Sequence, residues 1–199
     1  MKNTIIAIWC AAGALLLASC DSGTTNEQNT TEATSGTTAV ASADTTLTDD
    51  KRELMEFAAQ NNLLQVELGK LAIDQGTSDA VKAYGRNLVD WYTTKQKELS
   101  ELAQQHNVSL PQQMNEEGTK HLSELREAKN FNEEYWEQLT DAQKKAIDEF
   151  DSKVKDIEQS DATAFSLWAR NTLKELQAQY EQARGREVEL KNRDSGIQP

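Results

Sequence analysis

The segment from residue 48 to residue 193 contains one proline, Pro111, and is otherwise rich in residues that favour helix. Its apolar side chains recur at spacings of three and four, which is the period of an amphipathic helix. A stretch of about 145 residues suits one domain. The sequence therefore predicts a single all-α domain over residues 48–193.

Cap residues mark the first two helices. Thr48 or Asp49 is expected to cap a helix that runs to residue 75, where Gly76 can take the left-handed conformation common at helix C-termini. Ser78 then caps a second helix, which runs to about residue 105. The connection between them is short, so the two helices are predicted to be antiparallel neighbours.

Three more helices are predicted after Pro111, which interrupts the helical pattern. A short amphipathic helix covers the sequence "EEGTKHLSELREAK" at residues 116–129. A third long helix runs from about residue 132 to 158, and a fourth begins at Ser160 or Asp161 and continues to about residue 191.

Four long amphipathic helices bury their apolar stripes most simply in an antiparallel four-helix bundle. The short helix would then lie in the crossover between the second and third long helices. The alternative is a long coiled-coil dimer, whose heptads would have to continue through Gly76 and Pro111. They do not continue there, so the bundle is favoured.

The N-terminus has the pattern of a secretion signal. Lys2 precedes an apolar run at residues 5–17, which is too short to cross a bilayer as a helix of about 20 residues. The run ends in "LASC", residues 17–20, which resembles the bacterial lipoprotein box. We therefore expect residues 1–19 to be removed and Cys20 to carry acyl chains such as palmitate. A plain signal peptide cut after a small residue is the alternative.

The next segment, residues 20–47, is rich in Thr, Ser, Gly and Ala and nearly free of large apolar side chains. It cannot bury enough apolar surface to fold, so it is predicted to be a disordered tether with a reach of about 30 Å. Residues 194–199 are expected to form a disordered tail. The predicted location is the bacterial cell envelope, with the lipid anchored in a membrane at the outer membrane or periplasmic face.

Charge and cysteine content exclude several classes of function. The formal net charge of −12 repels nucleic acid, so nucleic-acid binding is not expected. Cys10 leaves with the signal and Cys20 is taken by lipid, which leaves no thiol for a disulfide, a metal or a nucleophile. We expect no cofactor. The membrane and an envelope protein are the expected partners.

Each long helix has one polar or amphipathic residue near the middle of its apolar stripe. Inward-facing residues at this level of an antiparallel bundle meet in one layer, which is where ferritin-like proteins place carboxylate and histidine ligands. The predicted central polar layer consists of Glu67, Tyr92, Gln143 and Gln179. The alternative is that these are ordinary residues at the boundary of an apolar face.

Three sequence motifs resemble those of a bacterial family. They are "QVELGKLA" at residues 65–72, "NVSLP" at 107–111 and "FNEEY" at 131–135. Together they resemble a ferritin-like family of secreted or envelope-anchored proteins catalogued as domain of unknown function 4142, over about residues 50–190. The resemblance implies a ferritin-like bundle, but the family has no established reaction.

The same resemblance points to missing ligands. Members of the family typically carry histidines at the places that align here with Tyr92, Gln143 and Gln179. Glutamine is a weak ligand for iron, manganese or zinc, and tyrosine binds iron well only as phenolate. Glu67 would then be the one strong ligand left. We therefore predict no metal site, and a hydrogen-bonded cluster in which Gln143 or Gln179 donates to the Glu67 carboxylate and Tyr92 closes the network.

No motif in the sequence indicates an enzyme. His106 and His121 lack metal-ligand spacing, and the chain has no phosphate-binding glycine loop. The favoured function is a non-catalytic, lipid-anchored envelope protein with a structural or protein-interaction role, which an exposed apolar patch would support. The alternatives are a metal-binding or oxidoreductase ferritin-like bundle and a binder of a small apolar ligand in the core, which would need an internal cavity.

Overall fold

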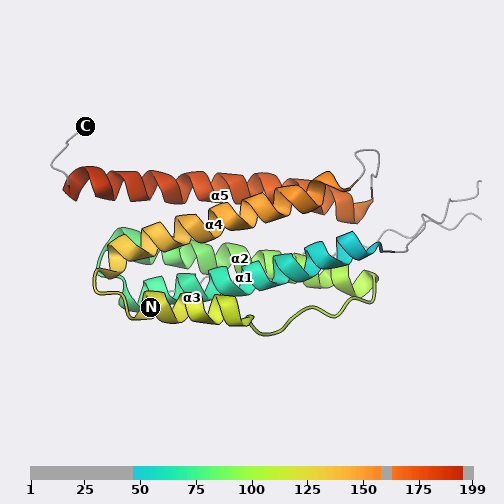
Figure 1. Ribbon diagram of the computed structural model, residues 1–199, viewed down its shortest axis with the longest axis horizontal. Coiled ribbons are helices and arrows are strands. Elements are labelled where there is room, and N and C mark those ends of the chain that lie inside the picture. Colours follow the sequence, from blue (N-terminus) through green and yellow to red (C-terminus); the bar gives the residue numbers. More distant parts are fainter. Residues whose placement is uncertain (1–46, 158–162, 195–199) are drawn as a thin grey trace, which may run out of the picture. The chain divides into compact units, whose positions relative to one another are not determined.

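A computed structural model describes residues 47–157 and 163–194 of the chain. Within these ranges there are five helices and no strand (Figure 1): α1 (Asp49–Gln75), α2 (Asp79–Gln105), α3 (Glu116–Arg126), α4 (Phe131–Lys155) and α5 (Ala164–Asp194). The all-helical prediction is confirmed, and the arrangement is compatible with a helical bundle. No described helix has the length and apolarity needed to span a membrane. Cys20, the signal segment and the tether up to residue 46 lie outside the described residues.

The helices begin where side chains can cap them. The Thr48 hydroxyl accepts a hydrogen bond from the Lys51 amide at 3.4 Å, and the Ser78 hydroxyl accepts one from the Val81 amide at 3.2 Å. Each bond satisfies a backbone N–H that has no partner inside its helix. Both predicted caps are confirmed. The predicted caps of the last helix, Ser160 and Asp161, lie outside the described residues.

Gly76 does not adopt the predicted left-handed conformation, since its φ is −57° and its ψ is 132°. The reason for glycine here is space, because a Cβ at this position would lie 2.4 Å from the Ala72 carbonyl oxygen and 2.7 Å from Val81. The left-handed residue is instead Asn107, with φ 56°, directly after the C-cap of α2. The Val108 amide donates to the Ala103 carbonyl at 2.9 Å, which completes a Schellman motif.

Helices α1 and α2 approach each other closely through glycine. A Cβ at Gly85 would lie 2.6 Å from the Gly69 carbonyl oxygen, so no larger residue fits without movement. Further along, the Asn62 amide donates to the Gln96 side chain at 3.0 Å. Since Asn62 precedes Gly69 in α1 whereas Gln96 follows Gly85 in α2, the two helices run in opposite directions.

Helix α4 packs between α1 and α5. At one end Lys153 pairs with Glu53 of α1 at 3.2 Å, and at the other Asn132 is hydrogen-bonded to Thr77 just beyond α1. Helices α1 and α4 therefore also run in opposite directions. On its other side α4 contacts α5, and α3 lies against α1 and α4. The shared core includes the buried side chains of Leu54, Leu68, Leu88, Leu99, Leu139, Phe150 and Phe165.

Candidate functional site

A buried polar layer lies halfway along the helices. It contains Gln65 of α1, Tyr92 of α2 and Gln143 of α4, whose exposed fractions are 0%, 1% and 2%. Along the helices, the contacts between α1 and α2 described above lie on both sides of Gln65 and Tyr92. The contacts between α1 and α4 lie on both sides of Gln65 and Gln143. Gln65, Tyr92 and Gln143 therefore lie at one level. Two members of the predicted layer, Tyr92 and Gln143, belong to it.

Glu67 does not point into this layer. Its side chain is 37% exposed, and its carboxylate pairs with Lys70 at 2.6 Å. The predicted hydrogen bond from Gln143 to Glu67 is wrong, because neither side-chain polar atom of Gln143 has a hydrogen-bond partner. The buried residue of α1 at this level is Gln65, which was not among the predicted site residues. A step of two residues along a helix rotates the side-chain direction by about 200°, so Gln65 points into the core whereas Glu67 points to the surface.

Gln179 makes its hydrogen bond near the polar layer through its backbone carbonyl and not through its side chain. Its side chain is half-buried, and its carbonyl accepts a hydrogen bond from the Tyr84 hydroxyl at 3.1 Å. The carbonyl belongs to a turn of α5, so this bond joins α5 to α2 near the polar layer. The predicted hydrogen bond from the Gln179 side chain to Glu67 is absent among the described residues.

The amides of the layer are unusual because they are buried without hydrogen bonds. Both polar atoms of Gln65 and both of Gln143 lack a partner, and so does the Tyr135 hydroxyl. Most buried polar atoms in proteins are paired, and each unpaired one destabilises the fold by about 1–3 kcal/mol. The layer thus holds interior amides that no other group of the described residues pairs with.

Two phenols, Tyr84 and Tyr92, lie near the Gln143 amide, and a third, Tyr135, lies near those two phenols. Burial raises the pKa of Tyr84 to about 12, and the nearby Gln143 amide opposes that rise. Burial is also the main cause that raises the pKa of Tyr92 and of Tyr135 above the ordinary value of 10. The Gln143 amide lies near the hydroxyls of Tyr84 and Tyr92 without the distance and angle of a hydrogen bond. All three phenols are therefore neutral at physiological pH.

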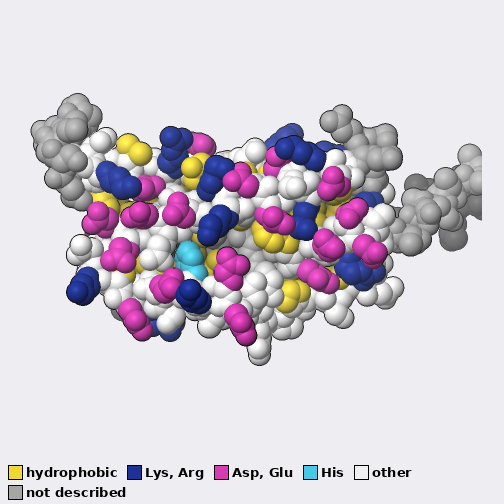
Figure 2. All heavy atoms as spheres, viewed as in Figure 1, with side chains coloured by type: hydrophobic (Ala, Val, Ile, Leu, Met, Phe, Trp, Pro, Cys, Tyr) yellow, Lys and Arg dark blue, Asp and Glu magenta, His cyan; other side chains and the backbone are white. Residues whose placement is uncertain are grey.

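A second candidate site is an open groove of about 950 Å³ on the surface between α1, α3 and α4. Its apolar floor is formed by Phe57 and Leu64 of α1, Met114 of the loop before α3, and Ala142 and Ala146 of α4. Figure 2 views this face, where acidic and basic side chains lie among scattered apolar ones. It is larger than a second open pocket of about 510 Å³, which is lined by residues of α2 and α5.

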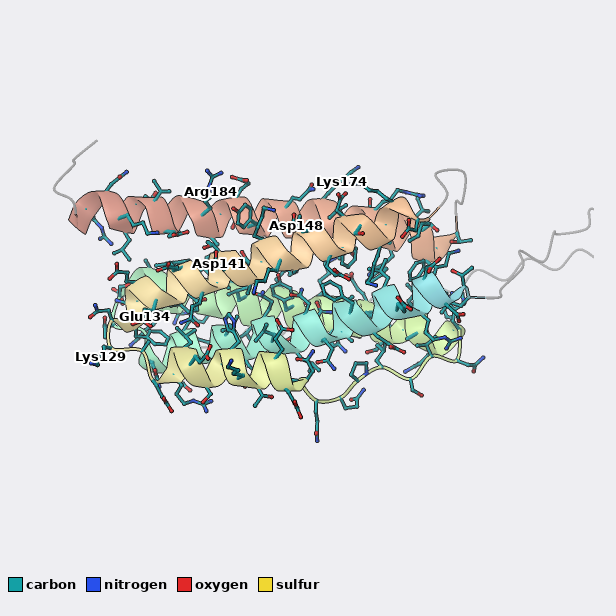
Figure 3. All side chains as sticks on the ribbon, viewed as in Figure 1. Lys129, Glu134, Asp141, Asp148, Lys174 and Arg184 are labelled. Carbon is teal, nitrogen blue, oxygen red and sulfur yellow. The ribbon has the colours of Figure 1, made fainter. Side chains whose placement is uncertain are left out.

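Carboxylates outnumber lysines around the groove. Two lysines, Lys145 and Lys153, face six acidic side chains: Glu53, Glu56, Glu117, Glu124, Asp141 and Glu149. Lys153 pairs with Glu53 and Glu149 at 3.2 Å and 3.5 Å. Glu56 and Asp141 are exposed and pair with no lysine or arginine within the described ranges. Asp141, labelled on α4 in Figure 3, lies close enough to His121 to act on the pKa of that imidazole.

One wall of the groove is held in place by Gln60 of α1. Its side-chain amide donates to the Gln113 carbonyl at 3.1 Å, and its side-chain oxygen accepts from the Asn115 amide at 2.9 Å. Asn115 in turn caps α3 through the Gly118 amide at 2.8 Å. These bonds fasten the loop before α3 to α1, so the groove is formed before anything binds to it.

Comparison with known protein families identifies the domain. A family model described as "Domain of unknown function (DUF4142)" matches residues 36–185. The chain belongs to the DUF4142 family. The matched range contains α1 to α4 and most of α5, and it confirms the family suggested by the three sequence motifs. No curated protein and no solved structure was found to match the chain.

The polar layer of this DUF4142 domain does not fit a transition metal. Its members are two neutral amides and phenols whose pKa values burial has raised, and both are poor ligands for such ions. The carboxylate predicted to face it belongs instead to the surface pair of Glu67 and Lys70. Across the described residues no three His, Cys, Asp or Glu side chains come together as metal ligands.

Proposed function

We propose that this DUF4142 protein is a non-catalytic, lipid-anchored component of the bacterial cell envelope that presents a ferritin-like, antiparallel four-helix bundle for contacts with another envelope protein. In this proposal Cys20 carries the lipid, residues 20–47 form the tether, and the long helices α1, α2, α4 and α5 form the bundle with α3 in the crossover. The opposite directions of α1 against α2 and of α1 against α4 support that arrangement.

The groove between α1, α3 and α4 is the observation that carries the interaction role. It is open to solvent, its floor is apolar, and its wall is fixed by Gln60. Grooves of this kind, with an apolar floor and polar margins, are typical of peptide recognition. The exposed apolar patch expected of an interaction surface is not present among the described residues, because the large exposed apolar side chains, Leu167 and Val188, lie far apart along α5. The interaction role therefore rests on the groove alone.

The anchoring part of the proposal is tested with Cys20→Ala. Cells expressing the unaltered chain or the variant are labelled with an alkyne analogue of palmitate and then separated into membrane and soluble fractions. The unaltered chain should be labelled and should sediment with membranes, whereas the variant should lose the label. Equal labelling and equal sedimentation of both chains would contradict the proposal.

The metal-binding alternative has a direct test. The protein, purified without chelators and then dialysed, is subjected to elemental analysis. The amides and phenols of the polar layer bind such ions weakly, so we expect far less than one ion per chain. Retention of iron, manganese or zinc near one ion per chain would contradict the non-catalytic proposal.

A further inference from the structure

We propose that the groove between α1, α3 and α4 binds a cationic amphipathic helix supplied by another protein. This inference rests on the interaction role proposed above and names the chemistry of the partner. The apolar stripe of that helix would cover Phe57, Leu64 and Met114, and its lysines or arginines would face the carboxylates along the margins. Helix-in-groove recognition uses anchors at spacings of three and four, which a floor of this kind can accept.

The length of the groove fits a helix of three to four turns. On α1 its lining extends from Glu53 to Leu64, and on α4 from Gln138 to Lys153. At 1.5 Å per residue these stretches are about 17 Å and about 22 Å long. A helix of about 11 to 15 residues has the same length. A small organic cation would fill only part of this space.

Charge indicates the sign of the partner. Glu56 and Asp141 line the groove from α1 and α4, and neither has a lysine or arginine partner in the described part of the chain. Two such carboxylates beside an apolar floor attract a cationic segment and repel an anionic one. The attraction would act mainly on the rate of association and would weaken as salt is added.

The chain's own flanking segments do not have the required chemistry. Residues 20–46 carry the acids Asp21, Glu27, Glu32 and Asp44 and no lysine or arginine, and residues 195–199 are uncharged in their side chains. A second copy is disfavoured by the net charge of −12 on each chain. The partner is therefore expected to be a different protein with a basic amphipathic segment.

The test uses the full-length chain and a fluorescent peptide of about 14 residues, with leucines at spacings of three and four and lysines elsewhere. Binding is measured by anisotropy at low and at physiological salt. Three further probes are used: the same peptide with glutamates in place of lysines, a scrambled lysine peptide without the apolar stripe, and spermidine as a competitor. We expect saturable binding only for the amphipathic lysine peptide.

Matched variants locate the binding site. Glu56→Gln with Asp141→Asn removes two charges from the groove and should weaken binding about three- to tenfold, as expected for two exposed ion pairs. Asp90→Asn with Glu101→Gln makes the same chemical changes at exposed positions on α2 and should leave the affinity unchanged. Ala142→Lys places a long cation on the floor and should abolish binding, whereas Ala178→Lys on the exposed side of α5 should not.

Several results would overturn the inference. These are no binding of the lysine peptide, equal binding of the glutamate or scrambled peptide, equal weakening by the two double variants, and displacement by spermidine at the concentration at which the peptide itself binds. Circular dichroism of each variant confirms that it is folded. None of these results alters the labelling of Cys20 or the membrane fractionation, so the failure of the groove can be told apart from a failure of the anchoring proposal.

Discussion

Replacing Gln65 by methionine is predicted to stabilise the protein. The Gln65 side chain is fully buried, and neither its amide nitrogen nor its oxygen has a hydrogen-bond partner. An unpaired buried polar group reduces stability by about 1–3 kcal/mol. Methionine is also unbranched and of similar length, so it fills the space and removes the unpaired groups. We expect Gln65→Met to raise the free energy of unfolding by about 1–3 kcal/mol.

The assay is urea denaturation followed by circular dichroism at the helical band. The midpoint should rise while the slope stays constant, because the surface exposed on unfolding hardly changes. Gln177→Met is the control: Gln177 is exposed on α5, and the change should stay within about 0.5 kcal/mol. If Gln65→Met instead lowers stability by about 1 kcal/mol or more, the amide has partners in solution, such as a buried water, and the argument for an unpaired layer fails.

Three further predictions concern the helix contact and the titrating groups. Gly85→Ala should destabilise the protein by about 1–3 kcal/mol, since the new Cβ would lie 2.6 Å from a backbone oxygen. Gly185→Ala should stabilise it by about 0.5–1 kcal/mol, because nothing lies within 4 Å of the new Cβ. Thermal denaturation checks both. Tyr84→Phe should lose about 1 kcal/mol at neutral pH with its hydrogen bond to Gln179. It should also lose less stability between pH 10 and pH 12 than the unaltered chain, because the raised pKa of Tyr84, about 12, lets the unfolded state ionise first. Burial lowers the pKa of His121 below its ordinary 6.5, so stability falls as pH drops through 6.5. Denaturation at about pH 7.5 and pH 5.5 should show a smaller fall for His121→Asn than for the unaltered chain.

The positions of the helices could be predicted to within a few residues, although α3 ends at Arg126 and α4 at Lys155, each three residues before its predicted end. Thr48 and Ser78 are strong capping residues placed directly before apolar patterns, so α1 and α2 begin where expected. Pro111 separates α2 from α3, also as expected. The last helix extends to Asp194, slightly beyond its predicted end, because nothing in the sequence near residue 191 breaks a helix.

The buried face of α1 could not be predicted from its large apolar residues. Leu64 and Leu71 predict a stripe around Glu67, but the face that contacts α2 at Gly85 has the small residues Gly69 and Ala72. Close backbone contact favours small side chains, which a hydrophobicity pattern underweights. The groove could not be predicted either, since it depends on how α3 and the loop before it lie against α1 and α4.

The glycine contact between Gly69 and Gly85 has a mechanical consequence. With two backbones touching, α1 cannot slide or rotate against α2 by a turn without a severe clash. The two hydrogen bonds of Gln60 hold the loop before α3 against the same helix, so this loop shares the fixed position of α1. The hairpin and the loop therefore keep one shape, which a guest has to match.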